Sequence, residues 1–218
     1  MKDGPISSTK ERLMRAAISI FARKGYKAAT VREICDQADI KNIYSINYYF
    51  GGKASLYKLI VELMFAAHAK HLPELRPGSS PLEQFKNYII SYCAMLYSGD
   101  DLALDTIRIF TAEMAQPSDF LPELVERHTK PQTLSFMQVV GEMLGPDVPE
   151  SVARDTCISI GSQIIYYSYA WPVVIAVFPD HPGMSAYHEQ LAEHIIRFSI
   201  GGIRAVKQYY LNGELTIK

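Results

Sequence analysis

The first fifty residues consist of short helical patterns separated by abrupt breaks, which restricts this part of the chain to small packed helices. From Thr9 onward, charged residues alternate with apolar residues that recur at the helical period on one stripe: Leu13, Ala16, Ala17, Ile20 and Phe21. Gly25 follows, and a glycine in the left-handed conformation commonly ends a helix. We therefore predict an amphipathic helix from Thr9 to about Gly25.

Two shorter helices are predicted next. Thr30 is followed three residues later by Glu33, so each side chain can accept a hydrogen bond from the backbone amide of the other residue. The helix that begins there is expected to bury Val31, Ile34 and Ala38 and to break at Asp39-Ile40. A third helix is predicted to begin with Asn42 as its N-cap, to bury Ile43, Ile46 and Phe50, and to end at Gly51-Gly52.

The rest of the chain also has helical patterns, and no alternating strand pattern occurs. A long helix is predicted from Lys53 to about Leu72, burying Leu56, Leu59, Ile60 and Leu63. Further helices are predicted over residues 80–97, 101–115, 121–144, 149–177 and 185–211, and Pro172 should kink or end the fourth of these. The predicted fold class is all-α, with a flexible arm at 1–8, a three-helix domain at 9–54 and a larger helical domain at 55–218.

Composition indicates a globular protein with an uneven charge distribution. Of the 218 residues, 48% are hydrophobic and 21% charged, with a net charge of −1. Residues 1–60 hold eleven Lys and Arg against five Asp and Glu, a net +6, while the remainder holds eleven against eighteen, a net −7. A basic end on an acidic body favours a polyanionic partner, with chance clustering on a solvated surface as the alternative.

Several other classes of protein are not indicated. No apolar run reaches the 18 or so residues of a membrane span, and the first residues lack the apolar core of a secretory signal. Cys35, Cys93 and Cys157 are odd in number and not at metal spacing, which is typical of reduced thiols in a cytoplasmic protein. His68 and His71 could share a metal with Glu74, but solvated helix histidines are commoner, so we expect no metal and no cofactor.

Residues 41–53, KNIYSINYYFGGK, combine polar groups with three tyrosines. With the isoleucines and Phe50 facing inward, the other side chains would face outward. Tyrosine and serine hydroxyls can contact phosphates, asparagine can bond adenine at two points, and a helix start with a lysine can hold a phosphate. Because the second and third helices form a helix-turn-helix, we predict that this surface contacts DNA through the following residues: Thr30, Lys41, Asn42, Tyr44, Ser45, Asn47, Tyr48, Tyr49 and Lys53.

At this point the sequence resembles the TetR family of bacterial transcriptional repressors. The resemblance lies in "FARKGYKAATVREICDQADI" followed by "SINYYFGGKASLY". It implies a homodimer whose N-terminal domains bind a palindromic DNA operator, with Thr30, Tyr48 and Lys53 at phosphate-contacting positions. The family usually has one residue fewer between the positions of Ile40 and Phe50, and a small residue where Tyr44 stands. We locate the extra residue in the turn at Lys41.

The remainder resembles the C-terminal domain of CecR-type TetR regulators, through "RIFTAEMAQPSDFLPELVERHTKPQTLSFMQVVGEMLG" and "SIGSQIIYYSYAWPVVIAVF". This implies a larger domain that binds a small-molecule inducer of an aromatic or antibiotic-like kind. Apolar and aromatic walls with a few polar groups make such a pocket. The candidates are Arg108, Phe110, Glu113, Phe136, Gln163, Tyr166, Tyr167 and Trp171. The alternative is an aromatic core with a satisfied Arg–Glu pair.

The last predicted helix indicates an interface between two copies of the chain. Glycine inside a helix costs about 1 kcal/mol relative to alanine, and close approach of another helix could offset the cost of Gly201-Gly202. We predict that this helix and residues 151–168 form a dimer interface through the following residues: Ile158, Ile165, Leu191, Ile195, Phe198, Gly201, Gly202, Ala205 and Tyr209. The alternative is that these residues belong to the core of a single chain.

Together these features predict a ligand-responsive repressor rather than an enzyme. The sequence contains no G-x-S-x-G, G-x-G-x-x-G or G-x-x-x-x-G-K-[ST] motif. The alternative function is a helical small-molecule-binding or interaction protein with degraded DNA binding, for which the extra residue and the bulky Tyr44 are the support.

Overall fold

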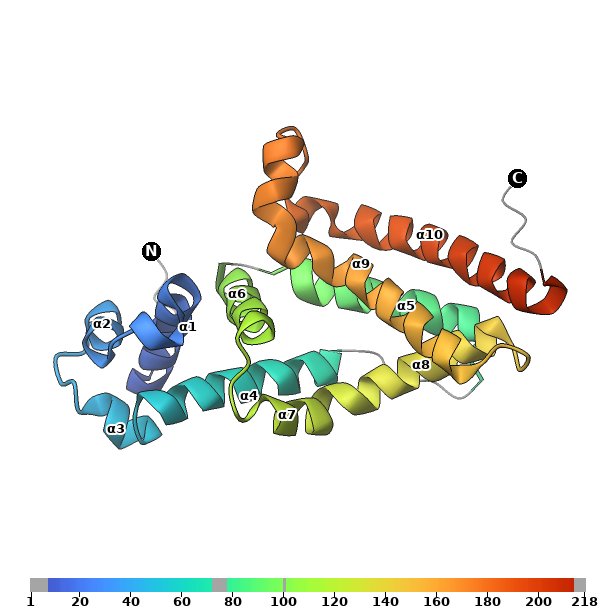
Figure 1. Cartoon of the computed structure of the whole chain (residues 1–218). Coiled ribbons are helices and arrows are strands. Elements are labelled where there is room, and N and C mark those ends of the chain that lie inside the picture. Colours follow the sequence, from blue (N-terminus) through green and yellow to red (C-terminus); the bar gives the residue numbers. More distant parts are fainter. Residues whose placement is uncertain (1–7, 72–77, 100, 214–218) are drawn as a thin grey trace. The chain divides into compact units, whose positions relative to one another are not determined.

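A computed structural model describes residues 8–71, 78–99 and 101–213, and these residues form helices and connecting turns without a strand (Figure 1). The all-α prediction is confirmed. The predicted arm at 1–8 lies outside the described residues except for Ser8, as does Leu72, the predicted end of the long helix. The helices are α1 (Thr9–Ala28), α2 (Val31–Gln37), α3 (Ser45–Phe50), α4 (Lys53–His71), α5 (Pro81–Tyr97), α6 (Asp101–Ala115), α7 (Leu121–Leu124), the π-helical turn η1 (Val125–Thr129), α8 (Lys130–Leu144), α9 (Glu150–Val177) and α10 (Met184–Asn212).

Short polar patterns determine where three of these helices begin. Reciprocal capping boxes join Ser8 to Glu11, Thr30 to Glu33 and Ser80 to Glu83, so that in each case the hydroxyl accepts from one amide and the carboxylate from another. The prediction for Thr30 and Glu33 is confirmed. The same Ser/Thr-x-x-Glu spacing could have predicted the starts at residues 9 and 81 to within one residue.

Gly25 interrupts α1 as predicted. Its φ of 76° lies in the left-handed region that favours glycine, and the chain resumes a helical path for only three residues before Ala29. The five apolar residues predicted on one stripe of this helix are all buried. Two residues, Ala29 and Thr30, separate the end of α1 from the start of α2.

The chain divides into two compact units. The N-terminal unit contains residues 8–67 and 101–124, so that it includes α1, α2, α3, most of α4, and also α6 and α7. Within it, α6 packs against α1, and the buried core includes Leu13, Phe21, Ile34, Ile46, Leu56 and Ile60. Leu63, predicted to be buried, is 49% exposed. The compact units thus differ from the predicted functional division near residue 54, since α6 groups with the first three helices.

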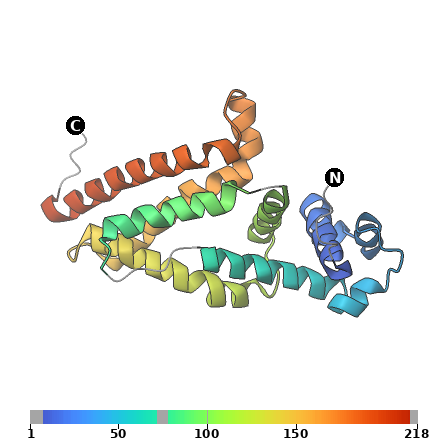
Figure 2. The same cartoon turned by 180° about the vertical axis from the view of Figure 1, so that it is seen from behind.

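The C-terminal unit contains residues 68–71, 78–99 and 125–213. Its core forms where α5 packs against α8, α9 and α10, which Figure 2 shows from behind. Phe136 stacks between Tyr88, at 3.9 Å between ring centroids, and Phe85, at 5.8 Å. Cys93 and Cys157 are buried free thiols in this core, and Cys35 is a buried free thiol in the other unit.

Two prolines alter the paths of helices in the second half of the chain. Pro172 lies inside α9 rather than at its end, and α9 bends in Figure 1 before it ends at Val177, as expected for a helix that contains a proline. The single helix predicted over 121–144 is instead three consecutive segments, α7, η1 and α8. Pro131 in the first turn of α8 has no N–H for the carbonyl four residues earlier, which accounts for the changed hydrogen bonding of η1.

Candidate nucleic-acid interface

A short helix presents a mostly polar surface in the N-terminal unit. Ile46 is fully buried and holds α3 against the unit, while Tyr44 is 72% exposed and Tyr48 83% exposed. We define the α3 surface as the exposed residues on and before this helix: Lys41, Asn42, Ile43, Tyr44, Asn47, Tyr48 and Tyr49. Ser45, also predicted to contact DNA, is half-buried. All nine predicted DNA-contacting residues are therefore exposed or half-buried. Eight of them, including Thr30, lie between the start of α2 and the end of α3, and the ninth, Lys53, is the first residue of α4.

The turn before α3 differs from the prediction. Asn42 is not the N-cap of α3; its Oδ1 accepts a hydrogen bond from the backbone N–H of Tyr44 at 3.0 Å, and Tyr44 occupies the cap position. Asp39, with a φ of 53°, redirects the chain after α2. Because residues 41–44 form turns rather than helix, Ile43 leaves the helical register and is 48% exposed, so its predicted burial is wrong.

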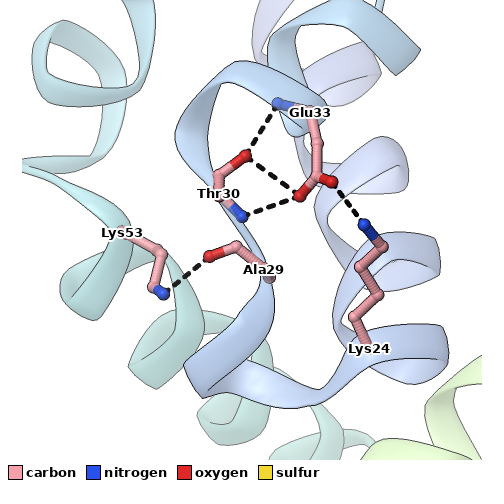
Figure 3. Close-up of polar contacts among 5 residues, drawn as sticks. All are labelled: Lys24, Ala29, Thr30, Glu33 and Lys53. Carbon is pink, nitrogen blue, oxygen red and sulfur yellow. Dashed lines mark hydrogen bonds and ion pairs between the residues drawn. The ribbon is translucent and has the colours of Figure 1, made fainter.

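The start of α2 is held by a hydrogen-bonded cluster (Figure 3). The Thr30 hydroxyl accepts from the Glu33 N–H at 3.2 Å and donates to Glu33 Oε2 at 2.9 Å, and the Thr30 N–H donates to the same oxygen at 3.1 Å. Lys24 forms an ion pair with the other carboxylate oxygen. The hydrogen bonds from Lys24 and Thr30 lower the pKa of Glu33 to about 2. Since the Thr30 hydroxyl already has an acceptor, a phosphate contact through it requires the hydroxyl to exchange Glu33 for the phosphate.

Lys53 has an internal role that the sequence did not reveal. Its ammonium group donates to the backbone carbonyls of Tyr26 and Ala29, both at 2.7 Å, and lies 4.5 Å from the centre of the Tyr26 ring. These contacts satisfy carbonyls at the end of α1 and fix the first residue of α4 beside them (Figure 3). Two of the three N–H groups are engaged, which leaves one for a phosphate oxygen.

The predicted inducer-binding residues do not gather in one compact unit. Arg108, Phe110 and Glu113 belong to α6 of the N-terminal unit, whereas Phe136, Gln163, Tyr166, Tyr167 and Trp171 belong to the C-terminal unit. Phe136 is part of the stacked core, and Trp171 contacts His181 edge to face at 5.3 Å.

The alternative to the pocket, a satisfied pair between Arg108 and Glu113, is wrong. Arg108 pairs with Asp105 at 2.8 Å, and Glu113 accepts a hydrogen bond from the Tyr57 hydroxyl at 2.6 Å. Glu113 is 3% exposed and also accepts from the N–H and hydroxyl of Ser118. The sequence pattern does not reveal the role of Tyr57, because its partner Glu113 is 56 residues away and the local pattern is that of a core aromatic residue.

A groove of about 340 Å³ lies between α9 and α10 of the C-terminal unit. It brings together three predicted inducer-binding residues, Gln163, Tyr166 and Tyr167, with two predicted interface residues, Leu191 and Ile195; Ser162 and His194 complete its lining. Gln163 lies 3.5 Å from the hydroxyl of Ser199. The groove therefore contains residues from both the predicted inducer-binding site and the predicted dimer interface.

The remaining predicted interface residues form an exposed, largely apolar surface on the same two helices. Ile158 is 58% exposed and Phe198 65% exposed, and Gly201, Gly202, Ala205 and Tyr209 are also exposed, while Ile165 is half-buried. A Cβ added at either glycine would have no heavy atom within 4 Å among those considered. Leu191 and Ile195 are buried within the chain, so they support this surface rather than belong to it.

By length and composition alone, α9 is apolar enough to cross a membrane, in contrast to the expectation from the sequence. Only 17% of its most apolar stretch is buried. Its exposed apolar side chains include Ile158, Tyr166, Tyr169 and Val173, on the helix that also provides part of the predicted interface. Exposed apolar surfaces of this kind also occur at protein–protein interfaces.

Comparison with known proteins agrees with this architecture. Residues 13–60 match the family "Bacterial regulatory proteins, tetR family". Residues 82–203, more than half of the chain, match "HTH-type transcriptional dual regulator CecR, C-terminal domain". The chain therefore belongs to the TetR family of transcriptional regulators. Within that family its C-terminal domain is of the CecR type, and the protein is a regulator and not an enzyme.

Part of the chain is similar in sequence to two other transcriptional regulators. The chain is 37% identical over 65 residues to the "Probable HTH-type transcriptional regulator YttP" of Bacillus subtilis, covering 30% of this chain and 31% of that protein. It is 25% identical over 84 residues to the HTH-type transcriptional repressor NicS of Pseudomonas putida, covering 38% and 39%. The matches thus span only about a third of these relatives.

The fold likeness extends over most of the chain. The ketosteroid transcriptional regulator KstR2 of Mycobacterium tuberculosis has a TM-score of 0.60 at 19% identity, covering 91% of this chain and 96% of that one. The transcriptional regulator FadR of Bacillus subtilis, solved in complex with stearoyl-CoA, has a TM-score of 0.57 at 17% identity, covering 85% and 97%. At these identities the likeness shows the fold alone.

Proposed function

We propose that this chain is a ligand-responsive transcriptional repressor that acts in the cytoplasm and binds a palindromic operator as a homodimer. The observation that supports DNA binding best is the α3 surface, whose tyrosine and asparagine side chains are exposed while Ile46 holds the helix in place. An α-helix fits the major groove of DNA, and these side chains have the chemistry to contact phosphates and base edges. The basic net charge of residues 1–60 favours the same partner.

The homodimer is supported by the exposed apolar surface of α9 and α10. The Phe198 ring is 65% exposed although it stacks on His194 at 6.2 Å, and a Cβ added at Gly201 or Gly202 would meet no other heavy atom of the described chain within 4 Å. Close packing with the same surface of a second copy would bury them. Two copies related by a twofold axis would present two α3 surfaces, which explains why we expect a palindromic operator with half-sites one or more helical turns apart.

The proposal that this chain represses transcription and responds to a ligand is based on its family and on similar proteins. NicS is named a repressor, and FadR was solved with stearoyl-CoA bound. We infer that an inducer, of an aromatic or antibiotic-like kind, binds one arrangement of the C-terminal unit better than another. α4 begins in the N-terminal unit and ends in the C-terminal unit, so it links the two along the chain. The inducer changes operator affinity only by its differential affinity for the two arrangements.

Selection of bound fragments from the source genome tests this function. Fragments recovered with the full-length protein should share a palindrome, and their complexes should weaken as salt rises because counterions are released. Titration of the complex with aromatic and antibiotic-like compounds should then identify one that lowers affinity. Weak binding without a shared sequence would instead support the alternative, a helical binding protein with degraded DNA binding. If no compound changed operator affinity, the ligand-responsive part of the proposal would fail on its own.

A further inference from the structure

We propose that the N-terminal unit contains a binding site for a small molecule with a carboxylate or phosphate group, in the cavity between α1 and α6. The cavity is open to solvent, since Leu104 is 42% exposed and the Arg108 side chain 64% exposed, and its volume of about 580 Å³ would accommodate a small molecule. Ser19, Ala22 and Arg23 of α1 line one side, and Leu104, Asp105 and Arg108 of α6 line the other. The two helices pack directly against each other, so the site lies within one compact unit.

The charges that line this cavity favour an anion. Arg23 and Arg108 contribute two guanidinium groups against the single carboxylate of Asp105, a net charge of +1. Arg108 donates from Nη1 to Asp105 at 2.8 Å, which holds its side chain at the cavity and leaves its other N–H groups for a ligand. Within the described part of the chain, Arg23 makes neither a hydrogen bond nor an ion pair.

Arginine is suited to this task because its planar group binds carboxylate and phosphate oxygens in pairs. The Ser19 hydroxyl adds a neutral donor beside Arg23, and Ala22 and Leu104 give the cavity an apolar portion. A carboxylate at the end of a short apolar chain, or a phosphate ester of similar size, would match both parts. The shared chemistry is one anionic group between two arginines, with a small apolar group beside it.

The position of the site distinguishes it from the proposed inducer site. The cavity shares Arg108 with the predicted inducer-binding residues, but its other lining residues are not among them. It adjoins α1, which packs directly against α2, whereas the inducer is proposed to bind the C-terminal unit. On the same helix α6, Glu113 binds the Tyr57 hydroxyl of α4. A ligand between α1 and α6 would therefore act within the unit that contains the helix-turn-helix. Its binding requires neither DNA nor dimerisation, so this inference stands apart from the proposed function.

The test uses the full-length protein without DNA, with hexanoate and inorganic phosphate as probes and hexanol as a neutral match. Side-chain Nε–H signals of the arginines are followed by NMR, and affinities are measured by calorimetry. Hexanoate should shift the signals of Arg23 and Arg108 saturably, phosphate should do so more weakly, and hexanol should not. R23Q and R108Q should each weaken hexanoate binding about tenfold. R15Q, an exposed arginine on the same helix α1 outside the cavity, should not.

Folding and alternative partners are controlled separately. R23K retains the charge without the planar fork and should bind hexanoate more tightly than R23Q but less tightly than the unaltered protein, with helix content by circular dichroism unchanged in all variants. The proposal is overturned if neither anion shifts the Arg23 and Arg108 signals saturably, or if R15Q loses as much affinity as R23Q. A loss of DNA affinity in R23Q without any response to hexanoate or phosphate would make Arg23 a DNA-backbone contact and would equally overturn it.

Discussion

The ammonium group of Lys53 donates a hydrogen bond of 2.7 Å to the backbone carbonyl of Ala29, which lies 24 residues earlier and directly before the N-cap of α2. The start of α4 and the approach to α2 are therefore joined by one side chain. A lysine that was predicted to contact phosphate thus has a structural role as well, and the two roles have different experimental consequences.

Replacing Lys53 by alanine should affect both stability and DNA binding. Loss of the two hydrogen bonds to Tyr26 and Ala29 should lower the free energy of unfolding by about 1–3 kcal/mol. Binding should weaken on every duplex alike, and the salt dependence should decrease by about one ion. Urea unfolding and fluorescence anisotropy measure the two effects. K58A, an exposed lysine on the same helix with a 3.8 Å ion pair, should change stability by less than about 1 kcal/mol. An unchanged stability in K53A would contradict the structural role.

The Glu33 carboxylate should make the start of α2 sensitive to acid. Its pKa is lowered to about 2 by Lys24 and Thr30, below the ordinary value of 4.5, so the stabilisation is present above about 4.5 and is lost as pH falls toward about 2. NMR titration of the side-chain carboxyl carbon should give a midpoint near 2. T30A removes one donor group and should raise that midpoint. A midpoint near 4.5 in the unaltered protein would contradict the hydrogen-bonded cluster.

His68 should cause a loss of stability at a higher pH. Burial lowers its pKa to about 4, and its ring meets Tyr92 edge to face at 4.9 Å. Since the unfolded chain binds a proton at about pH 6.5 and the folded chain only near 4, stability should fall as pH decreases between these values, by up to about 3 kcal/mol. Urea unfolding at a series of pH values measures this, and H68Q should flatten that part of the curve. Equal slopes for both proteins would show that His68 is not the cause.

Phe198 tests the proposed interface. Its ring is 65% exposed in the single chain, so F198E should leave the fold of the monomer intact while it places a charge in the centre of the proposed contact. Sedimentation at micromolar concentration should show a dimer for the unaltered protein and a monomer for F198E. R204Q, an exposed residue on the same helix outside the proposed set, serves as the control. A monomer for the unaltered protein would exclude the homodimer at that concentration.

The sequence predicted the helices well because their signals are local. The apolar stripe of α1, the Thr30–Glu33 capping box, the break at Gly25 and Pro172 inside α9 each depend on residues close in sequence, and they are found as expected. The turn before α3 was predicted less well. The left-handed Asp39 and the bond from Tyr44 to Asn42 determine its path, and neither has a periodic signal. Ile43 was therefore predicted to be buried, although it is exposed.

The site was predicted in part for the same reason. The exposed residues of one short helix can be predicted from their spacing, and most of the residues predicted to face outward near α3 are exposed in the structure. Contacts between residues far apart in the sequence cannot be predicted from a local pattern. The Tyr57–Glu113 hydrogen bond and the cavity lined by Arg23 and Arg108 are two examples. In both cases α6 packs in the N-terminal unit, which no local pattern in residues 101–115 indicates.

The most direct test of DNA recognition by the α3 surface is an anisotropy titration of a selected palindromic duplex against a scrambled duplex of equal length and composition. Tyr48 is 83% exposed, so Y48A should leave the free energy of unfolding within about 0.5 kcal/mol. The unaltered protein should prefer the palindrome by at least about a thousandfold at physiological salt, and Y48A should lose affinity for it. Equal affinity of the unaltered protein for both duplexes, or full affinity in Y48A, N47A and K53A alike, would contradict DNA recognition by this surface.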